Sequence, residues 1–230
     1  MPLGPLPRDY AVHTLAVQDR VGSGGRVSLA CGSYIPQAPN FVEIVDVNLM
    51  SSDPLSPSAV RLLHHFPPSR LRWLPSIGTE ADLLATSGDC IRIWSARGEL
   101  RQLLRHAENP KRRCAPITSL DAGHCDGRPH IASCDVYGLC ALWDAERGAM
   151  QQAVDLGQPL WDVAVGPGGL VAAVGDGGDC FLIDPRSPQD VSVFAPKEQV
   201  SGPARIAWGR RASGFAVAWQ GGHGGVALYG

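Results

Sequence analysis

Short apolar runs separated by glycine, proline and polar residues recur along the whole chain, and little of the sequence has helical spacing. Five runs end near an aromatic or branched residue: FVEIVDV (41–47), CIRIWS (90–95), LCALWD (139–144), DCFLID (179–184) and GVALYG (225–230). If Val45, Trp94, Trp143, Ile183 and Tyr229 are equivalent positions, successive runs are 49, 49, 40 and 46 residues apart. This spacing is close to the ~40–45 residues of a four-stranded propeller blade.

Three further sets of runs accompany the first set at regular positions. One set precedes it and ends in small or turn-forming residues: VSLACGS (27–33), DLLATSGD (82–89), PHIASCD (129–135), LVAAVGD (170–176) and GFAVAWQGG (214–222). A second set lies further upstream, and we expect its members to be the innermost strands, which line the axis: AVHTLAV (11–17), RLRWLPS (70–76), APITSLD (115–121), LWDVAVG (160–166) and ARIAWGR (204–210). The third set follows: AVRLLHH (59–65), ELRQLLR (99–105), AMQQAVD (149–155) and DVSVFAP (190–196). The runs of the third set, which we take as outer strands, alternate apolar with charged residues, whereas the inner runs are mainly apolar. This difference is expected because the inner strands of a blade are buried on both faces by neighbouring blades.

The sequence therefore predicts an all-β fold, a β-propeller forming a single domain over residues 1–230. The predicted blades are 11–65, 70–105, 115–155 and 160–196, with a partial fifth blade at 204–230. Because the chain stops at Gly230 directly after a third strand, we expect an incomplete ring and the front portion of a larger propeller. Apolar residues of the last blade are then expected to be exposed to water: Ala207, Trp208, Phe215, Val217 and Trp219.

Composition narrows the classes of function. The chain is 44% hydrophobic and 18% charged, which is ordinary for a globular domain. Its formal charge of −2 gives no field that would attract nucleic acid or an anionic membrane, so neither is an expected partner. No apolar run reaches the ~18 residues of a membrane helix, and the start lacks the apolar core of a signal peptide. Seven scattered cysteines without a CxxC pair suit reduced thiols, and we expect a cytoplasmic and nuclear protein.

Particular residues carry a more specific resemblance. The segment DLLATSGDCIRIW (82–94), followed by CAPITSLD (114–121), is similar to repeats of the Transparent Testa Glabra family, whose animal counterpart is a WD-repeat protein among the DDB- and cullin-associated factors. The similarity extends to the ACGSY turn (30–34), HHFPPSRLRW (64–73), VAAVGDGGDCFLIDPR (171–186) and ARIAW (204–208). The chain departs from the family at VDLGQPLW (154–161) and GDGGD (175–179). The resemblance implies a β-propeller of WD40 repeats.

The resemblance also implies a function. Family members resemble scaffolds that assemble MYB and basic helix-loop-helix transcription factors, or dual-specificity kinases with their substrates. In propeller receptors of cullin-type ubiquitin ligases, an Asp-x-Arg after the third strand resembles the docking box for the DDB adaptor. Asp184 and Arg186 in IDPR (183–186) occupy that place, with Ile183 where tryptophan is preferred, and WDAER (143–147) is a weaker match. The alternative is that Asp184 stabilises its own turn and Arg186 pairs at the surface.

Other candidate sites have simpler explanations. His124, Cys125, Asp126 and His130 are zinc-ligand types, but their spacing fits no zinc signature, and we predict a polar loop without metal. His64 and His65 precede Pro67 and Pro68 in the connector between two blades, and we expect them to have packing and capping roles there. The basic run of Lys111, Arg112 and Arg113 suits a solvated loop better than a phosphate contact or a nuclear import signal.

Two classes of function remain open. No strained GxSxG elbow or other catalytic signature occurs, so we predict a non-enzymatic scaffold that binds proteins and needs no cofactor. A ubiquitin-ligase substrate receptor is the alternative, and a propeller enzyme or ligand-binding protein is a further one. A deep pocket with converging titratable groups would favour an enzyme, and a shallow face would favour a scaffold.

Overall fold

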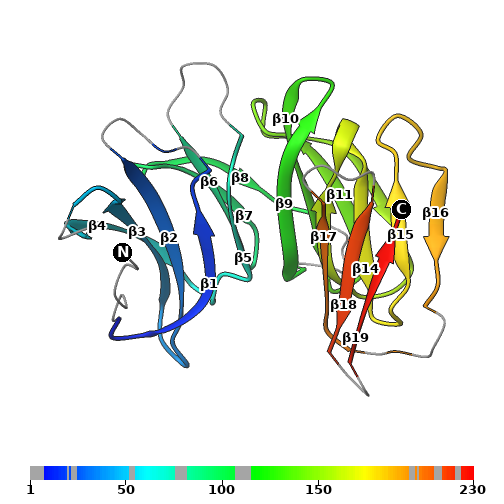
Figure 1. The fold of residues 1–230 in the computed structure, drawn as a ribbon, viewed down its shortest axis with the longest axis horizontal. Coiled ribbons are helices and arrows are strands. Elements are labelled where there is room, and N and C mark those ends of the chain that lie inside the picture. The colour runs from blue at the N-terminus through cyan, green and yellow to red at the C-terminus, as the bar shows by residue number, and fades with distance from the viewer. Residues whose placement is uncertain are drawn as a thin grey trace.

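The computed structural model describes residues 8–19, 21, 25–51, 55–75, 82–106, 115–196, 200, 202–209, 214–220 and 224–230, and the side chains of residues 55–59 are outside the description. Within these residues the chain forms nineteen strands and one short 3-10 helix, η1 (Pro167–Gly169). The strands make five antiparallel sheets that follow one another around an axis (Figure 1). This arrangement confirms the predicted all-β propeller of four four-stranded blades and part of a fifth.

Each sheet takes consecutive strands, with the first strand innermost. The first sheet contains β1 (Ala11–Val17), β2 (Arg26–Tyr34), β3 (Asn40–Asn48) and β4 (Leu55–His64). The second contains β5 (Arg70–Trp73), β6 (Leu83–Ser87), β7 (Ile91–Ser95) and β8 (Leu100–Leu104). The third contains β9 (Ile117–Cys125), β10 (Arg128–Asp135), β11 (Leu139–Asp144) and β12 (Ala149–Asp155). The fourth contains β13 (Leu160–Val165), β14 (Val171–Gly175), β15 (Cys180–Ile183) and β16 (Val191–Phe194), and the fifth contains β17 (Ala204–Trp208), β18 (Phe215–Trp219) and β19 (Gly225–Tyr229).

The turns between second and third strands are fixed by local sequence. In the third sheet, Oδ1 of Asp135 accepts hydrogen bonds from the backbone N–H groups of Tyr137 and Leu139, at 2.8 and 3.1 Å. Gly138 has a φ of 96°, a left-handed conformation that glycine adopts at little cost. A Cβ at this position would also lie 2.7 Å from the carbonyl oxygen of Gln158. An Asp-x-x-Gly turn is therefore required here by both conformation and space.

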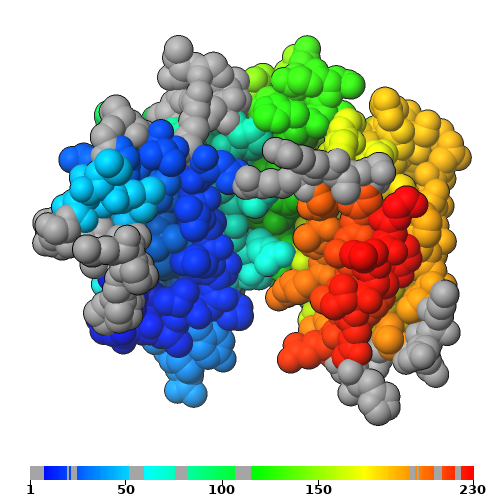
Figure 2. Space-filling model, in the orientation of Figure 1, coloured from blue at the N-terminus to red at the C-terminus, as the bar shows by residue number. Residues whose placement is uncertain are grey.

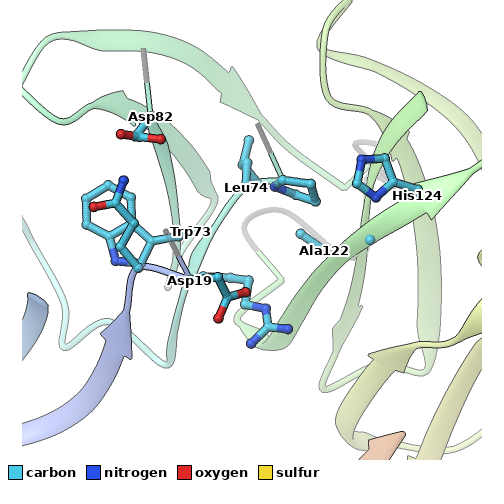
Figure 3. Close-up of a pocket in the computed structure, with 10 residues that line it drawn as sticks. Asp19, Trp73, Leu74, Asp82, Ala122 and His124 are labelled. Atoms are coloured by element: carbon cyan, nitrogen blue, oxygen red, sulfur yellow. The ribbon is translucent and has the colours of Figure 1, made fainter. Parts of the chain in front are cut away.

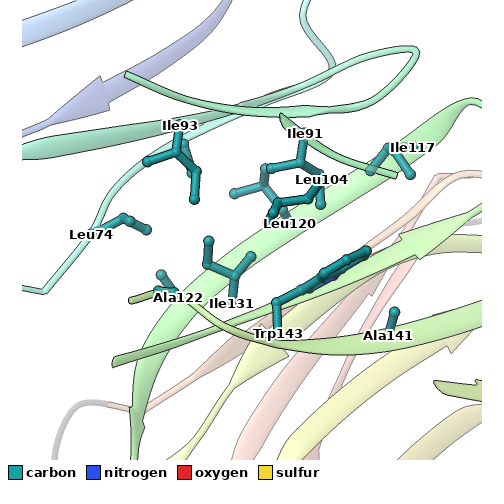
Figure 4. Close-up of a cluster of buried hydrophobic side chains, with 12 residues drawn as sticks. Leu74, Ile91, Ile93, Leu104, Ile117, Leu120, Ala122, Ile131, Ala141 and Trp143 are labelled. Carbon is teal, nitrogen blue, oxygen red and sulfur yellow. The ribbon is translucent and has the colours of Figure 1, made fainter. Parts of the chain in front are cut away.

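The core is divided into clusters that lie between neighbouring sheets. Figure 4 shows one of them, in which apolar side chains of the second and third sheets point toward one another. Its largest members are Ile91, Ile93, Leu104, Leu120, Ile131 and Trp143. Trp94 and Trp143 lie on β7 and β11, the third strands of their sheets, which confirms that they are equivalent positions. The apolar face of each strand thus serves to hold one sheet against the next.

A hydrogen-bonded chain anchors the tryptophan of the third sheet. The indole Nε1 of Trp143 donates to Oγ of Ser133 at 2.9 Å, and Nε2 of His106 hydrogen-bonds with the same oxygen at 2.8 Å. The other ring nitrogen of His106 lies 2.8 Å from Oδ2 of Asp135. Although burial alone would raise the pKa of Asp135, hydrogen bonds from His106 and the backbone hold it below its usual value. These hydrogen bonds connect β10 and β11 to His106, which lies in the connector that precedes the sheet.

A similar arrangement anchors the tryptophan of the second sheet to His64, the last residue of β4 in the first sheet. The indole Nε1 of Trp94 donates to Oγ1 of Thr86 at 3.0 Å, and Nε2 of His64 hydrogen-bonds with this oxygen at 3.0 Å. His64 is buried and His65 is exposed, so the predicted packing role is confirmed for His64 and is wrong for His65. Burial and the nearby Arg92 guanidinium lower the pKa of His64 to about 4. The imidazole is therefore neutral at pH 7.

We expect His64 to make the protein less stable in mild acid. Because its folded pKa of about 4 lies below the usual 6.5, the unfolded chain binds the proton more readily. The contribution of His64 is complete above pH 6.5 and is lost as the pH falls from 6.5 toward 4, at about 1.4 kcal/mol per pH unit. Urea unfolding of wild type and His64→Gln at pH 7 and pH 5 measures this, and the variant should lose less stability. An equal loss in both proteins would contradict the assignment.

The fifth sheet has one covered and one open face. Ala204, Ile206, Phe215 and Val217 are buried against the fourth sheet. The expectation that Phe215 and Val217 would be exposed was therefore wrong, because strand alternation turns them inward; Trp208 and Trp219 are partly buried, and Ala207 is exposed. The open face instead presents alternate residues of the three strands: Arg205, Ala207, Ala216, Ala218, Val226 and Leu228.

The first and fifth sheets, which form the two ends of the arc, do not pack closely against each other in the described part of the chain. Among the described strands, the fifth sheet packs extensively only on the fourth. In the lower half of Figure 2, a hollow separates the blue first sheet from the orange and red fifth sheet. Val226 and Leu228 on the open face are 72% and 82% exposed. The described part of the propeller is thus an open arc with aliphatic side chains in water.

Two further sequence expectations concern thiols and membranes. The six cysteines in the described residues are all free and buried, as predicted for reduced thiols; Cys114 lies outside the described residues. In the third sheet, burial raises the pKa of Cys140 to about 12, so this thiol remains protonated. The described part of the chain has no helix with the length and hydrophobicity needed to cross a bilayer.

Candidate functional sites

The innermost strands enclose a cavity along the axis of the arc. Its volume is about 710 Å³, and residues of β1, β5, β9, β13 and β17 all line it. Apolar walls come from Leu15, Leu120, Val163 and Trp208. Arg70, Arg72 and Asp121 provide its charged side chains. The sequence predicted that the first strand of each blade would line the axis, and this prediction is confirmed for all five sheets.

Asp162 connects the inner strands beside this cavity. Its carboxylate is fully buried, and Nη2 of Arg70 donates to both oxygens at 3.0 and 2.9 Å. The hydroxyl of Ser119 donates to Oδ1, and the backbone N–H of Ile206 donates to Oδ2 at 3.0 Å. These three partners lie on β5, β9 and β17, so one carboxylate connects four of the five inner strands. A buried charge with this many donors is well compensated.

A second acid repeats the arrangement on a smaller scale. Oδ1 of Asp121 lies 2.8 Å from Nε of Arg72, and Oδ2 accepts the backbone N–H of Val165 at 2.9 Å. Burial raises the pKa of Asp121, while Arg72 acts in the opposite direction. Sequence analysis missed both acids. The available signal was an acidic residue in each of two inner runs, APITSLD (115–121) and LWDVAVG (160–166), together with the arginines of RLRW (70–73).

A smaller pocket of about 280 Å³ lies where the first three sheets meet. Trp73, Leu74 and Ala122 supply apolar walls, while Asp82 and His124 lie on its rim (Figure 3). The indole N–H of Trp73 donates to the backbone oxygen of Ala16 at 3.3 Å, which fixes the ring between two sheets. Among the described residues, those that line this pocket include no serine, threonine or cysteine. Its lining thus combines apolar walls with side chains of both charge signs, Asp19, Asp82 and Arg72.

Asp184 and Arg186, the predicted docking pair, lie on an exposed turn after β15. Nε and Nη2 of Arg186 donate to Asp184 Oδ1 and Oδ2 at 2.9 and 2.7 Å, and the backbone N–H of Arg186 donates to Oδ1 at 3.0 Å. Hydrogen bonds from Arg186 lower the pKa of Asp184. Their side chains are 32% and 63% exposed. Asp184 thus accepts a backbone hydrogen bond within its own turn and pairs with Arg186 at the surface, which are the contacts that the alternative predicted. Ile183 is buried in the core.

The weaker match, WDAER (143–147), has a different geometry. Asp144 Oδ1 accepts the backbone N–H groups of Glu146 and Arg147, both at 3.0 Å. Nε of Arg147 lies 3.9 Å from Oδ2 of Asp144, a much longer separation than in the first pair. Asp144 is buried and Arg147 is exposed. This turn is therefore held mainly by backbone contacts to the aspartate.

The residues considered as zinc ligands are used in other contacts. β9 includes His124 and Cys125, and a tight turn at Asp126 and Gly127 leads into β10, so the predicted loop is a two-residue hairpin turn. His130 hydrogen-bonds through Nδ1 to the carbonyl of Arg128 and through Nε2 to Gln151. No cluster of potential metal ligands occurs among the described residues. Lys111, Arg112 and Arg113 lie outside the described residues.

These features define the class of protein. Antiparallel sheets follow one another around an axial cavity, and third-strand tryptophans donate to second-strand hydroxyl groups. The fold is a β-propeller of the WD40 type.

Comparison with known proteins agrees with this fold. No family model matches the chain. The chain is 25% identical over 219 residues to the DDB1- and CUL4-associated factor 7 homolog of Dictyostelium discoideum, covering 92% of this chain and 65% of that protein. The WD40 domain of Toxoplasma gondii coronin has a TM-score of 0.65 at 16% identity, covering 95% of this chain and 62% of that one. Saccharomyces cerevisiae Sqt1 has a TM-score of 0.66 at 17% identity, covering 84% and 53%. The chain thus spans less than two thirds of each.

Proposed function

We propose that this protein is a non-enzymatic scaffold that binds partner proteins over the faces of the propeller. The observation that carries the proposal is the axial cavity, whose described lining has charged and apolar residues but no serine, threonine, cysteine or histidine. Such a lining offers no nucleophile with an adjacent base, whereas it supplies arginine and aromatic anchors for a protein surface. The resemblance to the Transparent Testa Glabra family extends the proposal to transcription factors or dual-specificity kinases as partners in cytoplasm and nucleus.

A second candidate function is substrate receptor of a cullin-type ubiquitin ligase. Two observations favour it: the exposed Asp184–Arg186 pair, and the similarity to a protein named as a DDB1- and CUL4-associated factor homolog. A guanidinium and a carboxylate held on a turn can pair with charged groups of an adaptor. In this function the turn after β15 contacts the adaptor, and the propeller faces bind the substrate.

Replacing Asp184 and Arg186 by alanine should distinguish the receptor function from the scaffold function. We expect Asp184→Ala/Arg186→Ala to lower recovery of a DDB1-type adaptor at least tenfold when the tagged chain is captured from its own cells and the eluate is measured by mass spectrometry. Each exposed charge contributes little to folding, so the melting temperature should stay unchanged.

Glu99→Ala/Arg101→Ala is the matched control, because Glu99 and Arg101 have the same spacing, form a 2.6 Å ion pair and are 60% and 56% exposed. The control should recover the adaptor as the wild type does. Undiminished capture by the docking variant would reject the receptor function at this site. Recovery of other proteins by all three chains would still support a scaffold, whereas no recovered protein would count against it.

A further inference from the structure

The outward face of the first sheet has an unusual composition. In this sheet Ala16, Val42 and Ile44 pack against the second sheet, so alternate residues of the same strands point the other way. One cross-strand row on that outward face consists of Leu15, Cys31, Glu43 and Arg61. We call the surface formed by Cys31, Phe41, Glu43 and Arg61 the Glu43 face. Sheets two to five use the corresponding face to pack against the preceding sheet.

Glu43 is a charged residue at a position where packing is expected. The third-strand residue two places before the tryptophan-equivalent position is Arg92 in the second sheet, which pairs with Asp89 of its own turn. In the third and fourth sheets it is Ala141 and Phe181, and both are buried. The side chain of Glu43 is only 6% exposed, so its carboxylate needs cationic partners. The first sheet therefore has a buried carboxylate on the face opposite to the one that packs against the second sheet.

The chain's own N-terminal segment fills this site. Nε of Arg8 lies 2.8 Å from Oε2 of Glu43, and the hydroxyl of Tyr10 donates to the same oxygen at 3.0 Å. The ring of Tyr10 meets Phe41 edge to face at 4.7 Å between centroids. Burial and the Glu43 carboxylate both raise the pKa of Tyr10, so this phenol stays a donor. Residues 8–10, which we call the strap, thus contribute a guanidinium and an aromatic ring.

Arg61 completes the site from the edge of the sheet. Its Nε donates to Oε1 of Glu43 at 3.2 Å, and its guanidinium lies 4.5 Å above the ring of Phe41. Arg61 is 54% exposed, whereas Arg8 is only 19% exposed. Arg61 therefore lies at the exposed edge of the site, and Arg8 fills its interior.

We propose that the Glu43 face is a docking site for an arginine-bearing extended segment of a partner protein, and that the strap occupies this site in the free protein. The chemistry that recognises the segment is an arginine for Glu43 and, two residues later, an aromatic ring for Phe41. A short tether holds the strap at an effective concentration of about millimolar, so a partner segment must compete with it. The proposal rests on the scaffold function and adds a specific site to it.

A labelled peptide tests the proposal on the full chain. The probe is a fluorescein-labelled peptide with the sequence GPLPRDY of residues 4–10, and the control peptide has glutamate in place of its arginine. Arg8→Glu should repel the strap from Glu43, and we expect this variant to bind the probe at least tenfold more tightly than wild type in fluorescence anisotropy. The control peptide should bind neither protein. Adding Glu43→Gln to Arg8→Glu should abolish the gain.

Equal binding of the probe by wild type and Arg8→Glu would overturn the proposal, and so would equal binding of both peptides by the variant. Arg8→Gln is the second variant if Arg8→Glu lacks a cooperative melt. If neither variant folds, the strap is a structural part of the sheet and the proposal is wrong, because a displaceable segment cannot be required for folding. None of these results depends on capture of an adaptor through Asp184 and Arg186, so this proposal can fail while the proposed function stands.

Discussion

Asp162→Ala is expected to lower the free energy of unfolding by about 3–5 kcal/mol, because it leaves the partly buried Arg70 without its carboxylate. It also removes the acceptor of the Ser119 hydroxyl and of the Ile206 backbone N–H. A domain is stable by only about 5–15 kcal/mol, so a large part of the stability would be lost. Urea unfolding followed by tryptophan fluorescence measures the change.

Two further variants serve as controls for the unfolding measurement. Asp162→Asn keeps the shape and one acceptor, so it should lose less stability than Asp162→Ala. Glu99→Ala breaks an ion pair that is exposed on both sides, and such pairs contribute about 0–1 kcal/mol. If Asp162→Ala were as stable as Glu99→Ala, the carboxylate could not be the group that holds the inner strands together.

The 230-residue chain is expected to self-associate through the open face of its fifth sheet. Val226 and Leu228 are 72% and 82% exposed there, and full burial of such side chains contributes about 1.5–3 kcal/mol each. We expect light scattering after size exclusion to give a mass well above 24.4 kDa that rises with concentration. Val226→Thr/Leu228→Lys should shift the protein toward the monomer, because it makes the open face polar.

The control for this experiment changes aliphatic residues elsewhere. Leu100 and Leu103 on the outer strand β8 are 50% and 44% exposed, and Leu100→Lys/Leu103→Lys should leave the association unchanged. A wild-type chain that remains a 24.4 kDa monomer at high concentration would show that the open face does not drive association.

Much of the fold could be predicted from the sequence because blades repeat. The spacing of Trp94 and Trp143 placed both on third strands, and the run AVHTLAV gave β1 with its observed bounds. Alternation of apolar residues depends only on neighbouring positions in the sequence, so it predicts strands without knowledge of the tertiary structure. The face assignment of the fifth sheet failed at Phe215 and Val217, because period alone does not say which set of alternate residues meets the neighbouring sheet.

The sites were harder to predict than the fold. Asp184 and Arg186 are two residues apart, so a local motif was enough to place them together. Asp162 and Arg70 are 92 residues apart, and Arg8 precedes β1 whereas Glu43 lies on β3. Pairings of this kind depend on how sheets curve around the axis, which a single sequence does not specify.

The 92-residue separation of Arg70 and Asp162 also affects synthesis of the chain. A ribosome adds roughly 5–20 residues per second, so the guanidinium of Arg70 precedes its carboxylate partner by roughly 5 to 20 s. The hairpins of the second and third sheets can form within that interval, because their strands are adjacent in sequence. The nascent protein therefore passes through a stage in which formed blades still lack the contact that sets their spacing, and chaperones can act on it then.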